Sequence, residues 1–189
     1  MDWKIPGTVL EGDRQTIGRM GEPGYCLPPM DYFWMRQITD ITGLEAYTVQ
    51  NWVKRGFLAP PEGRVYTVDQ LCRIILINML KCVFPMERIC RMLSYVNGKL
   101  DDTADDIIPD SKLYLMFIRL AARAKEMDKN PEAELDRELE NYKEPYPGAA
   151  KRVRKVLKIM LTGYLSYRMK QEAEEKLDEL LKGEPEYER

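Results

Sequence analysis

The stretch from residue 35 to residue 66, MRQITDITGLEAYTVQNWVKRGFLAPPEGRVY, constrains the fold more than any other part of this chain. Its apolar residues recur at spacings of three and four, the period of a helix that packs on one side. These residues are Ile38, Ile41, Leu44, Val49, Trp52 and Val53. Gly43 and Gly56 interrupt the pattern, and glycine tolerates the positive φ with which many helices end. The stretch therefore predicts two short helices, the second over residues 45–55, joined by a tight turn at Gly43.

The outer face of the second predicted helix is made of residues that can hydrogen-bond. It consists of Tyr47, Gln50, Asn51 and Lys54. Two helices joined by a short turn that contains glycine are typical of the helix-turn-helix, whose second helix can enter the major groove of DNA. The following segment, APPEGRVY, predicts a small β-hairpin that turns at Glu62-Gly63 and points Arg64 outward. We therefore expect a mainly α fold with a winged helix-turn-helix over residues 35–98.

Charged residues are distributed unevenly along the chain, although the net charge is only −2. Residues 34–99 contain nine Lys or Arg and five Asp or Glu, which gives this part a net charge of +4. The residues before it carry a net charge of −2 and those after it −4. The predicted helix-turn-helix is thus the basic part of an acidic protein, as a surface that faces phosphates requires.

The composition argues against metal sites and against enzymatic chemistry. The chain contains no His, and its four cysteines lack CxxC spacing, so neither a zinc finger nor a Cys-His catalytic pair is expected. Cys72, Cys82 and Cys90 fall among apolar helical residues and are interpreted as small buried residues, with a thiolate metal sensor as the alternative. Sequence motifs of hydrolases and phosphate-binding loops are absent. We expect no enzyme, no cofactor and no metal.

No apolar run in the chain reaches the roughly 18 residues that a membrane-spanning helix requires. The longest one, residues 74–80, is interrupted by Asn78. The N-terminus also lacks the apolar segment of a secretory signal. We therefore expect a cytoplasmic protein without membrane contact.

Outside the helix-turn-helix, residues 1–34 are rich in Gly and Pro and show no clear period, which predicts an extended or irregular N-terminal arm. After the hairpin, Thr67 and Gln70 fit a capping box that opens a helix with apolar residues on nearly every side. Such a helix should be central, and Asn78 within it is interpreted as a satisfied core amide. Pro85 then opens a second helix.

The order of these elements resembles the DNA-binding domain of MerR-type regulators over residues 35–97. The resemblance is carried by three segments, ITDITGLEAYTVQNWVKRGFLAPP, RVYTVDQLCRI and FPMERICRML. The whole string is still more similar to an uncharacterised bacterial family of MerR-like proteins, judging by QNWVKRG, INML and DDIIPDSKLY. The resemblance implies a MerR-like winged helix-turn-helix, a bacterial origin and double-stranded DNA as the partner.

Seven residues are the candidate DNA contacts. They are Tyr47, Thr48, Gln50, Asn51, Lys54, Arg55 and Arg64. The three cationic residues are assigned to phosphates, which position the protein, while Tyr47, Gln50 and Asn51 are assigned to bases or backbone. MerR-type sequences have Arg-Tyr-Tyr/Phe where this chain has Gln50, Asn51 and Trp52, and a better helix cap than Glu45. Gln and Asn side chains can read the N6 and N7 edge of adenine through two hydrogen bonds.

The C-terminal half of the chain divides into a linker and a helical region. Residues 99–110 contain a run of five aspartates without EF-hand spacing, and this segment is interpreted as a solvated acidic linker. The run consists of Asp101, Asp102, Asp105, Asp106 and Asp110. Residues 111–189 predict a helical region with helices over residues 111–128, 131–142 and 149–181.

The last predicted helix has a wide apolar stripe and an unusual arrangement of charge. Basic residues gather over residues 151–158 and acidic residues over residues 172–179. Both groups oppose the helix dipole, at a cost of roughly 0.3–1 kcal/mol per well-placed charge. An antiparallel second copy would set basic ends against acidic ends, so we expect a homodimer through the C-terminal helices, as the MerR resemblance also implies. Internal packing against residues 111–128 is an equal alternative.

These observations lead to two hypotheses about function. The first is a sequence-specific, double-stranded DNA-binding transcriptional regulator that acts as a dimer. The second is a protein-interaction or structural helical module that keeps the same fold with weak or no DNA binding. No residue pattern indicates an effector ligand, an operator sequence or the direction of regulation.

Overall fold

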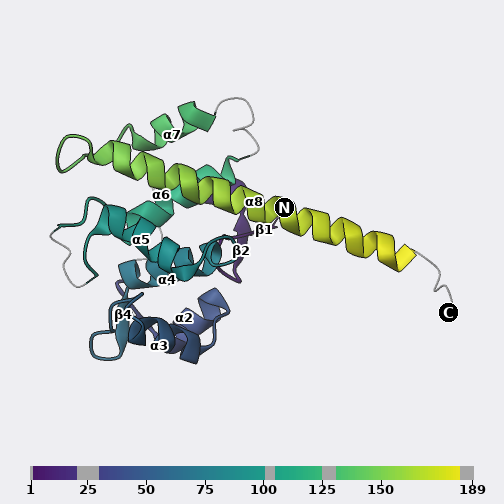
Figure 1. Ribbon diagram of the computed structural model, residues 1–189, viewed down its shortest axis with the longest axis horizontal. Helices are drawn as coiled ribbons and strands as arrows, with labels where there is room; N and C mark the ends of the chain where they lie inside the picture. The colour runs from purple at the N-terminus through teal and green to yellow at the C-terminus, as the bar shows by residue number, and fades with distance from the viewer. Residues whose placement is uncertain (1, 21–29, 101–104, 125–130, 184–189) are drawn as a thin grey trace.

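The computed structural model describes residues 2–20, 30–100, 105–124 and 131–183, which form a mainly helical protein with small two-stranded sheets (Figure 1). The elements are β1 (Asp2–Lys4), β2 (Glu11–Asp13), α1 (Arg14–Gly18), β3 (Tyr32–Trp34), α2 (Met35–Thr42), α3 (Ala46–Lys54), β4 (Val65–Thr67), α4 (Val68–Leu80), α5 (Met86–Asn97), α6 (Asp110–Ala122), α7 (Pro131–Leu139) and α8 (Ala149–Gly183). Among the described residues, no helix combines the length and the apolar character needed to cross a membrane. The α2–α3 pair lies at one end of the molecule, and α7 lies at the other (Figure 1).

The two short helices expected from the sequence are α2 and α3. Gly43 ends α2 in the left-handed conformation with a φ of 70°, and Gly56 follows α3 with a φ of 72°. Ile38 of α2 and Val49 of α3 are completely buried in the core. Glu45 precedes α3 without a side-chain capping hydrogen bond, as expected of a poor cap.

The β-hairpin expected over residues 59–66 is reduced to one bridge, between Glu62 and Val65. The turn within this bridge consists of Gly63 and Arg64, one residue later than predicted, with φ values of 54° and 75°. A longer hairpin cannot form, because the two consecutive prolines before Glu62 lack the N–H groups of a strand ladder. β4 pairs instead with β3, which precedes α2 in the chain.

Helix α4 forms the centre of the core, as its apolar sequence predicts. Residues 71–77 are all buried, and the helix packs against α2, α5, α6 and α8. The expected capping box is present: the Gln70 N–H donates to Thr67 Oγ1 at 3.2 Å, and the Thr67 N–H donates to Gln70 Oε1 at 2.9 Å. Asn78 Nδ2 donates to two backbone carbonyls, each at 3.0 Å, so this amide is satisfied.

Residues 2–20 are more regular than the arm expected from their Gly and Pro content. β1 and β2 pair antiparallel, and α1 packs on α6. The guanidinium of Arg14 donates to the carbonyls of Ala121 and Ala122 of α6. Gly7 approaches α4 so closely that a Cβ on it would lie 2.5 Å from the Ile75 carbonyl oxygen. The N-terminal residues are therefore part of the packed structure.

The segment before α6 is not a solvated linker throughout, contrary to the expectation for residues 99–110. Asp110 is buried at the start of α6, where its Oδ2 lies 3.1 Å from Arg73 Nη1 of α4. Asp69 Oδ1, also on α4, accepts a hydrogen bond from the Ser111 N–H at 2.8 Å. Two charged contacts thus join the N-terminal turns of α4 and α6. The first two aspartates of the run lie outside the described residues.

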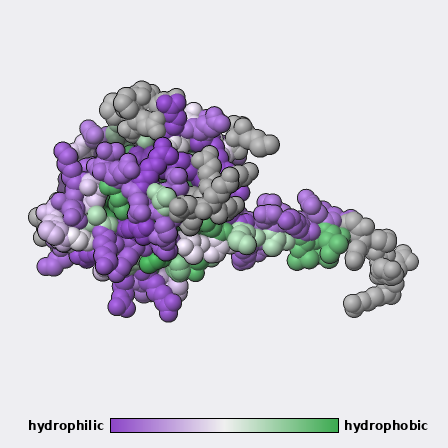
Figure 2. Space-filling view, turned by 90° about the horizontal axis from the view of Figure 1, so that it is seen from above, coloured by the Kyte–Doolittle hydropathy of each residue, from purple (hydrophilic) through white to green (hydrophobic). Residues whose placement is uncertain are grey.

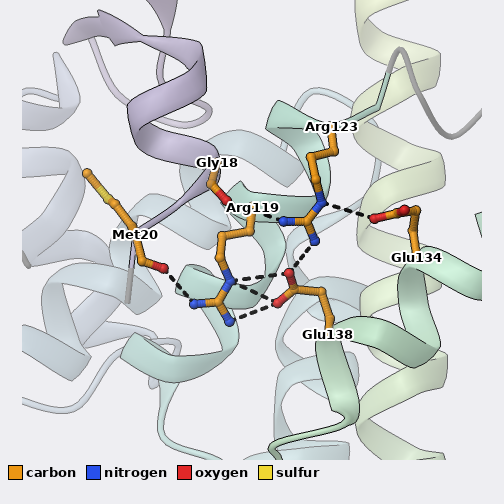
Figure 3. Close-up of polar contacts among 6 residues, drawn as sticks. All are labelled: Gly18, Met20, Arg119, Arg123, Glu134 and Glu138. Atoms are coloured by element: carbon orange, nitrogen blue, oxygen red, sulfur yellow. Dashed lines mark hydrogen bonds and ion pairs between the residues drawn. The ribbon is translucent and has the colours of Figure 1, made fainter. Parts of the chain in front are cut away.

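Arg119 of α6 and Arg123, directly after its last residue, connect α1 and α7 to the core (Figure 3). Arg119 Nε lies 2.9 Å from Glu138 Oε2, and Arg123 Nε lies 3.0 Å from Glu134 Oε2. Arg123 also pairs with Glu138, and both guanidinium groups donate to backbone carbonyls at the end of α1. Each charge in the network has a partner, which is why Glu138 can be buried.

Helix α8 is divided into a buried half and an exposed half. Val153, Leu157 and Met160 in its first half are inaccessible to solvent, because this half packs against α5, α6 and α7. Two basic residues near its start, Arg154 and Lys158, are paired within the chain, as in the 2.8 Å contact between Arg154 Nε and Asp136 Oδ1. The alternative of internal packing thus holds for the first half, while the second half extends beyond the body of the molecule (Figure 1).

We predict that Asp106→Asn changes the pH dependence of stability. Burial and the nearby carboxylates of Asp110 and Asp105 raise the pKa of Asp106 to about 6. A raised pKa means tighter proton binding in the folded chain, so Asp106 lowers the free energy of unfolding as the pH rises from 3.8 to about 6. Asp106→Asn should therefore gain stability relative to the wild type across this interval and keep that gain above it. Urea unfolding at a series of pH values measures the effect, and parallel profiles would contradict it.

We also predict that Glu138→Ala destabilises the protein strongly, because it leaves two arginines without their shared carboxylate. Removal of one partner from a largely buried ion pair costs about 3 kcal/mol or more. Glu140→Ala, an exposed change just after α7, should cost under about 0.5 kcal/mol and is the matched control. Guanidinium unfolding measures both variants, and equal midpoints would show that the network contributes little to stability.

Candidate nucleic-acid interface

Helix α3 is held in one orientation by the residues on its inner side. Val49 is completely buried, and Trp52 is 7% exposed with Lys81 Nζ 5.9 Å from the centre of its ring. The segment after α3 is tied to α4, because Arg73 Nε donates to the Phe57 carbonyl at 3.2 Å. α3 consequently presents one defined side to solvent.

That outer side carries residues selected from the sequence. Tyr47, Gln50, Asn51 and Lys54 are all exposed, whereas Thr48 is half-buried at the edge and its N–H donates to the Glu45 carbonyl. The acidic C-terminal helices leave this side open, because α7 and the first half of α8 lie at the opposite end of the molecule (Figure 1). The period-based prediction of an exposed polar face on α3 is confirmed.

The two arginines assigned to phosphates have different surroundings. Arg55 Nη2 lies 3.1 Å from Glu87 Oε1, and the guanidinium lies 4.6 Å from the centre of the Phe57 ring. This ion pair is exposed and contributes under about 1 kcal/mol, so a phosphate can compete with Glu87 for Arg55. Arg64 is exposed in the turn before β4, where it has a φ of 75°.

Further basic residues, which sequence reasoning did not select, lie on α5. Arg88 and Arg91 are exposed, and their spacing of three places them on one side of the helix. The Arg55–Glu87 contact brings the start of α5 next to the end of α3. The basic surface therefore runs from α3 onto α5. The net positive charge of residues 34–99 indicated a basic surface in the sequence. Only the tertiary contact between Arg55 and Glu87 shows that α3 and α5 both contribute to it.

Two aromatic side chains beside this surface are also exposed to solvent. Tyr32 and Trp34 are 59% and 58% exposed on one face of β3, whereas Phe33 points into the core. Trp34 is opposite Val65 in the sheet, one residue from Arg64. Phe33 therefore packs into the core, whereas Tyr32 and Trp34 are available to a partner.

The Cys, Asp and Glu side chains do not form a metal site in the described part of the chain. No three His, Cys, Asp or Glu side chains there are grouped closely enough to hold a metal ion. Burial, with Asp110 and Asp69 nearby, raises the pKa of the Cys72 thiol far above its ordinary value, so this thiol stays protonated. Cys90 is half-buried, and Cys82 is exposed, contrary to expectation, because α4 ends before it.

One family model matches the part of the chain that carries this interface. A family described as a domain of unknown function (DUF1836) matches residues 31–117, slightly less than half of the chain. Uncharacterized protein YkrK of Bacillus subtilis (strain 168) is 27% identical over 94 residues, which are 48% of this chain and 40% of YkrK. The chain thus spans two fifths of the length of that relative. No solved structure matches the chain.

These matches correct the family assignment made from the sequence. The matching family is not that of MerR-type regulators, and the MerR assignment is therefore wrong. A pair of short helices followed by a turn and a long helix is an arrangement that unrelated families share, so it does not identify one of them. Over residues 31–117 this chain is similar to a domain of unknown function.

Proposed function

We propose that this protein is a sequence-specific, double-stranded DNA-binding transcriptional regulator that acts as a homodimer. The observation that carries the proposal is the outer side of α3. Exposed Gln50, Asn51 and Lys54 lie together there on a helix whose inner side is anchored in the core. A helix held this way can enter a major groove, which is about 12 Å wide, without rearrangement of its backbone.

The finer fold that fits this role is a winged helix-turn-helix. α2 and α3 are the helix pair, and α3 is the recognition helix. The turn at Gly63-Arg64, held by the Glu62–Val65 bridge, is a minimal wing. Arg64 at this turn and Lys54 at the end of α3 bind phosphates on either side of the groove, and Arg88 and Arg91 extend the contact along α5.

We predict that the double variant Lys54→Ala, Arg64→Ala weakens binding to all duplexes. Each lost phosphate contact lowers the slope of log K against log salt by about 1, so the slope should fall by about 2. The matched control is Lys143→Ala, Lys155→Ala, which removes the same charge from exposed positions near α7 and α8. Fluorescence anisotropy with a duplex selected from a random-sequence pool measures all three proteins.

We predict that loss of base contacts lowers sequence discrimination, whereas loss of phosphate contacts lowers the salt dependence of binding. Gln50→Ala and Asn51→Ala should each cost about 1–3 kcal/mol of discrimination between the selected duplex and a scrambled one, with the salt slope unchanged. The same anisotropy titrations supply both readouts. If the wild type enriches no sequence and shows no salt-dependent binding, the proposal fails and the protein-interaction module becomes the better description.

A further inference from the structure

Beyond Gln171, no described residue of the chain buries the side chains of α8. Every side chain from Glu172 to Lys182 is exposed, and the helix extends away from the body in both views (Figures 1 and 2). Residues 165–182 span roughly 27 Å at 1.5 Å per residue. Most helices in proteins owe their stability to the packing of an apolar face, and residues 172–182 have no such packing against the described part of their own chain.

An apolar stripe runs along this half at a constant spacing of four residues. Its members are Leu165, Met169, Ala173, Leu177 and Leu181. Met169 is 72% exposed and Leu177 53%, and the end of the projecting helix is coloured as hydrophobic in Figure 2. Contiguous exposed apolar residues of this kind mark an interaction surface.

The stripe is symmetric about its small central residue. When a second copy lies antiparallel with the two Ala173 residues in register, Met169 faces Leu177 of the partner subunit. Leu177 then faces Met169 of the partner subunit, and the outer leucines of the stripe match in the same reciprocal way. Such reciprocity is what a two-fold interface requires, because residue i meets residue j and residue j meets residue i.

The spacing also determines how the two helices meet. Residues four apart form a ridge inclined to the helix axis, and two such ridges pack at a crossing angle of about −50°. Ala173 at the crossing point lets the two axes approach closely. The contact is therefore a crossing of a few turns, with Met169, Ala173 and Leu177 at its centre.

The charges of this segment favour the antiparallel direction. Residues 165–171 contain Arg168 and Lys170 and no acidic residue, whereas residues 172–181 contain five acidic residues and one Lys. Antiparallel helices set the basic part of one against the acidic part of the other, and parallel helices would set like charges together. At the start of α8, Arg154 and Lys158 cannot take this role, because their ion pairs with Asp136 and Glu132 hold them within the chain.

We propose that the protein forms a two-fold homodimer in which the α8 helices of two subunits cross antiparallel at Ala173. The partner of the exposed stripe is thus a second copy of this chain. The role of this dimer rests on the proposed function, because a dimer of this kind presents two α3 helices to one DNA duplex. The dimer is measured without DNA, so it can fail while DNA binding by α3 stands, and DNA binding can fail while the dimer stands.

The first test is the molecular mass of the whole protein in solution. Sedimentation equilibrium at tens of micromolar should give twice the 22.1 kDa of one chain. Met169→Ala, Leu177→Ala should sediment as a monomer, since it removes the centre of the stripe while keeping helix propensity. Glu175→Ala, Glu179→Ala, on the opposite side of the same helix, should remain a dimer. A monomeric wild type, or dissociation of both variants alike, overturns the proposal.

The second test fixes the direction and register of the crossing. In a background with Cys26, Cys82 and Cys90 replaced by Ser, Met169→Cys mixed with Leu177→Cys should form a disulfide-linked dimer on mild oxidation. Each variant alone should not, because an antiparallel crossing keeps identical positions other than 173 apart beyond the 4.4–6.8 Å Cα separation of a disulfide. Linkage of Met169→Cys to itself, without linkage in the mixture, overturns the antiparallel arrangement.

Discussion

The buried guanidinium of Arg73 is the contact on which the arrangement of the molecule depends. It is 5% exposed, it pairs with Asp110 at the start of α6, and it donates to the Phe57 carbonyl after α3. A buried charge without a partner costs several kcal/mol, so the ion pair with Asp110 must form when Arg73 is buried. One side chain of the central helix α4 thereby fixes the α2–α3 pair and the C-terminal helices relative to each other.

This rigidity bears on the proposed interface. α3 is anchored by Val49 and Trp52 on its inner side and by the Phe57 contact beyond its end, so its outer side is fixed before any partner arrives. A preorganised surface loses little conformational entropy on binding, which leaves more of the contact energy for affinity. In this proposal, two separate parts of the molecule bind different partners: α3 binds the duplex, and the second half of α8 binds a second subunit.

Structural features that depend on residues close together in the sequence could be predicted from the sequence. The left-handed turns at Gly43 and Gly56 and the capping box of Thr67 and Gln70 involve residues within a few positions of one another. The exposed side of α3 followed from helical period alone. The family could not be recognised in this way, because the same short-range signals occur in unrelated chains and only the match over residues 31–117 corrected the assignment.

Contacts between distant parts of the chain could not be predicted. No local signal in the sequence shows that Asp110 pairs with an arginine 37 positions earlier while other aspartates face water. Nor does a local signal show that β4 pairs with β3, a strand that precedes α2. For α8, the sequence by itself determined the stripe, its symmetry about Ala173 and the order of its charges. The tertiary structure decided that the first half is buried and the second half open, because burial depends on where α5, α6 and α7 pack.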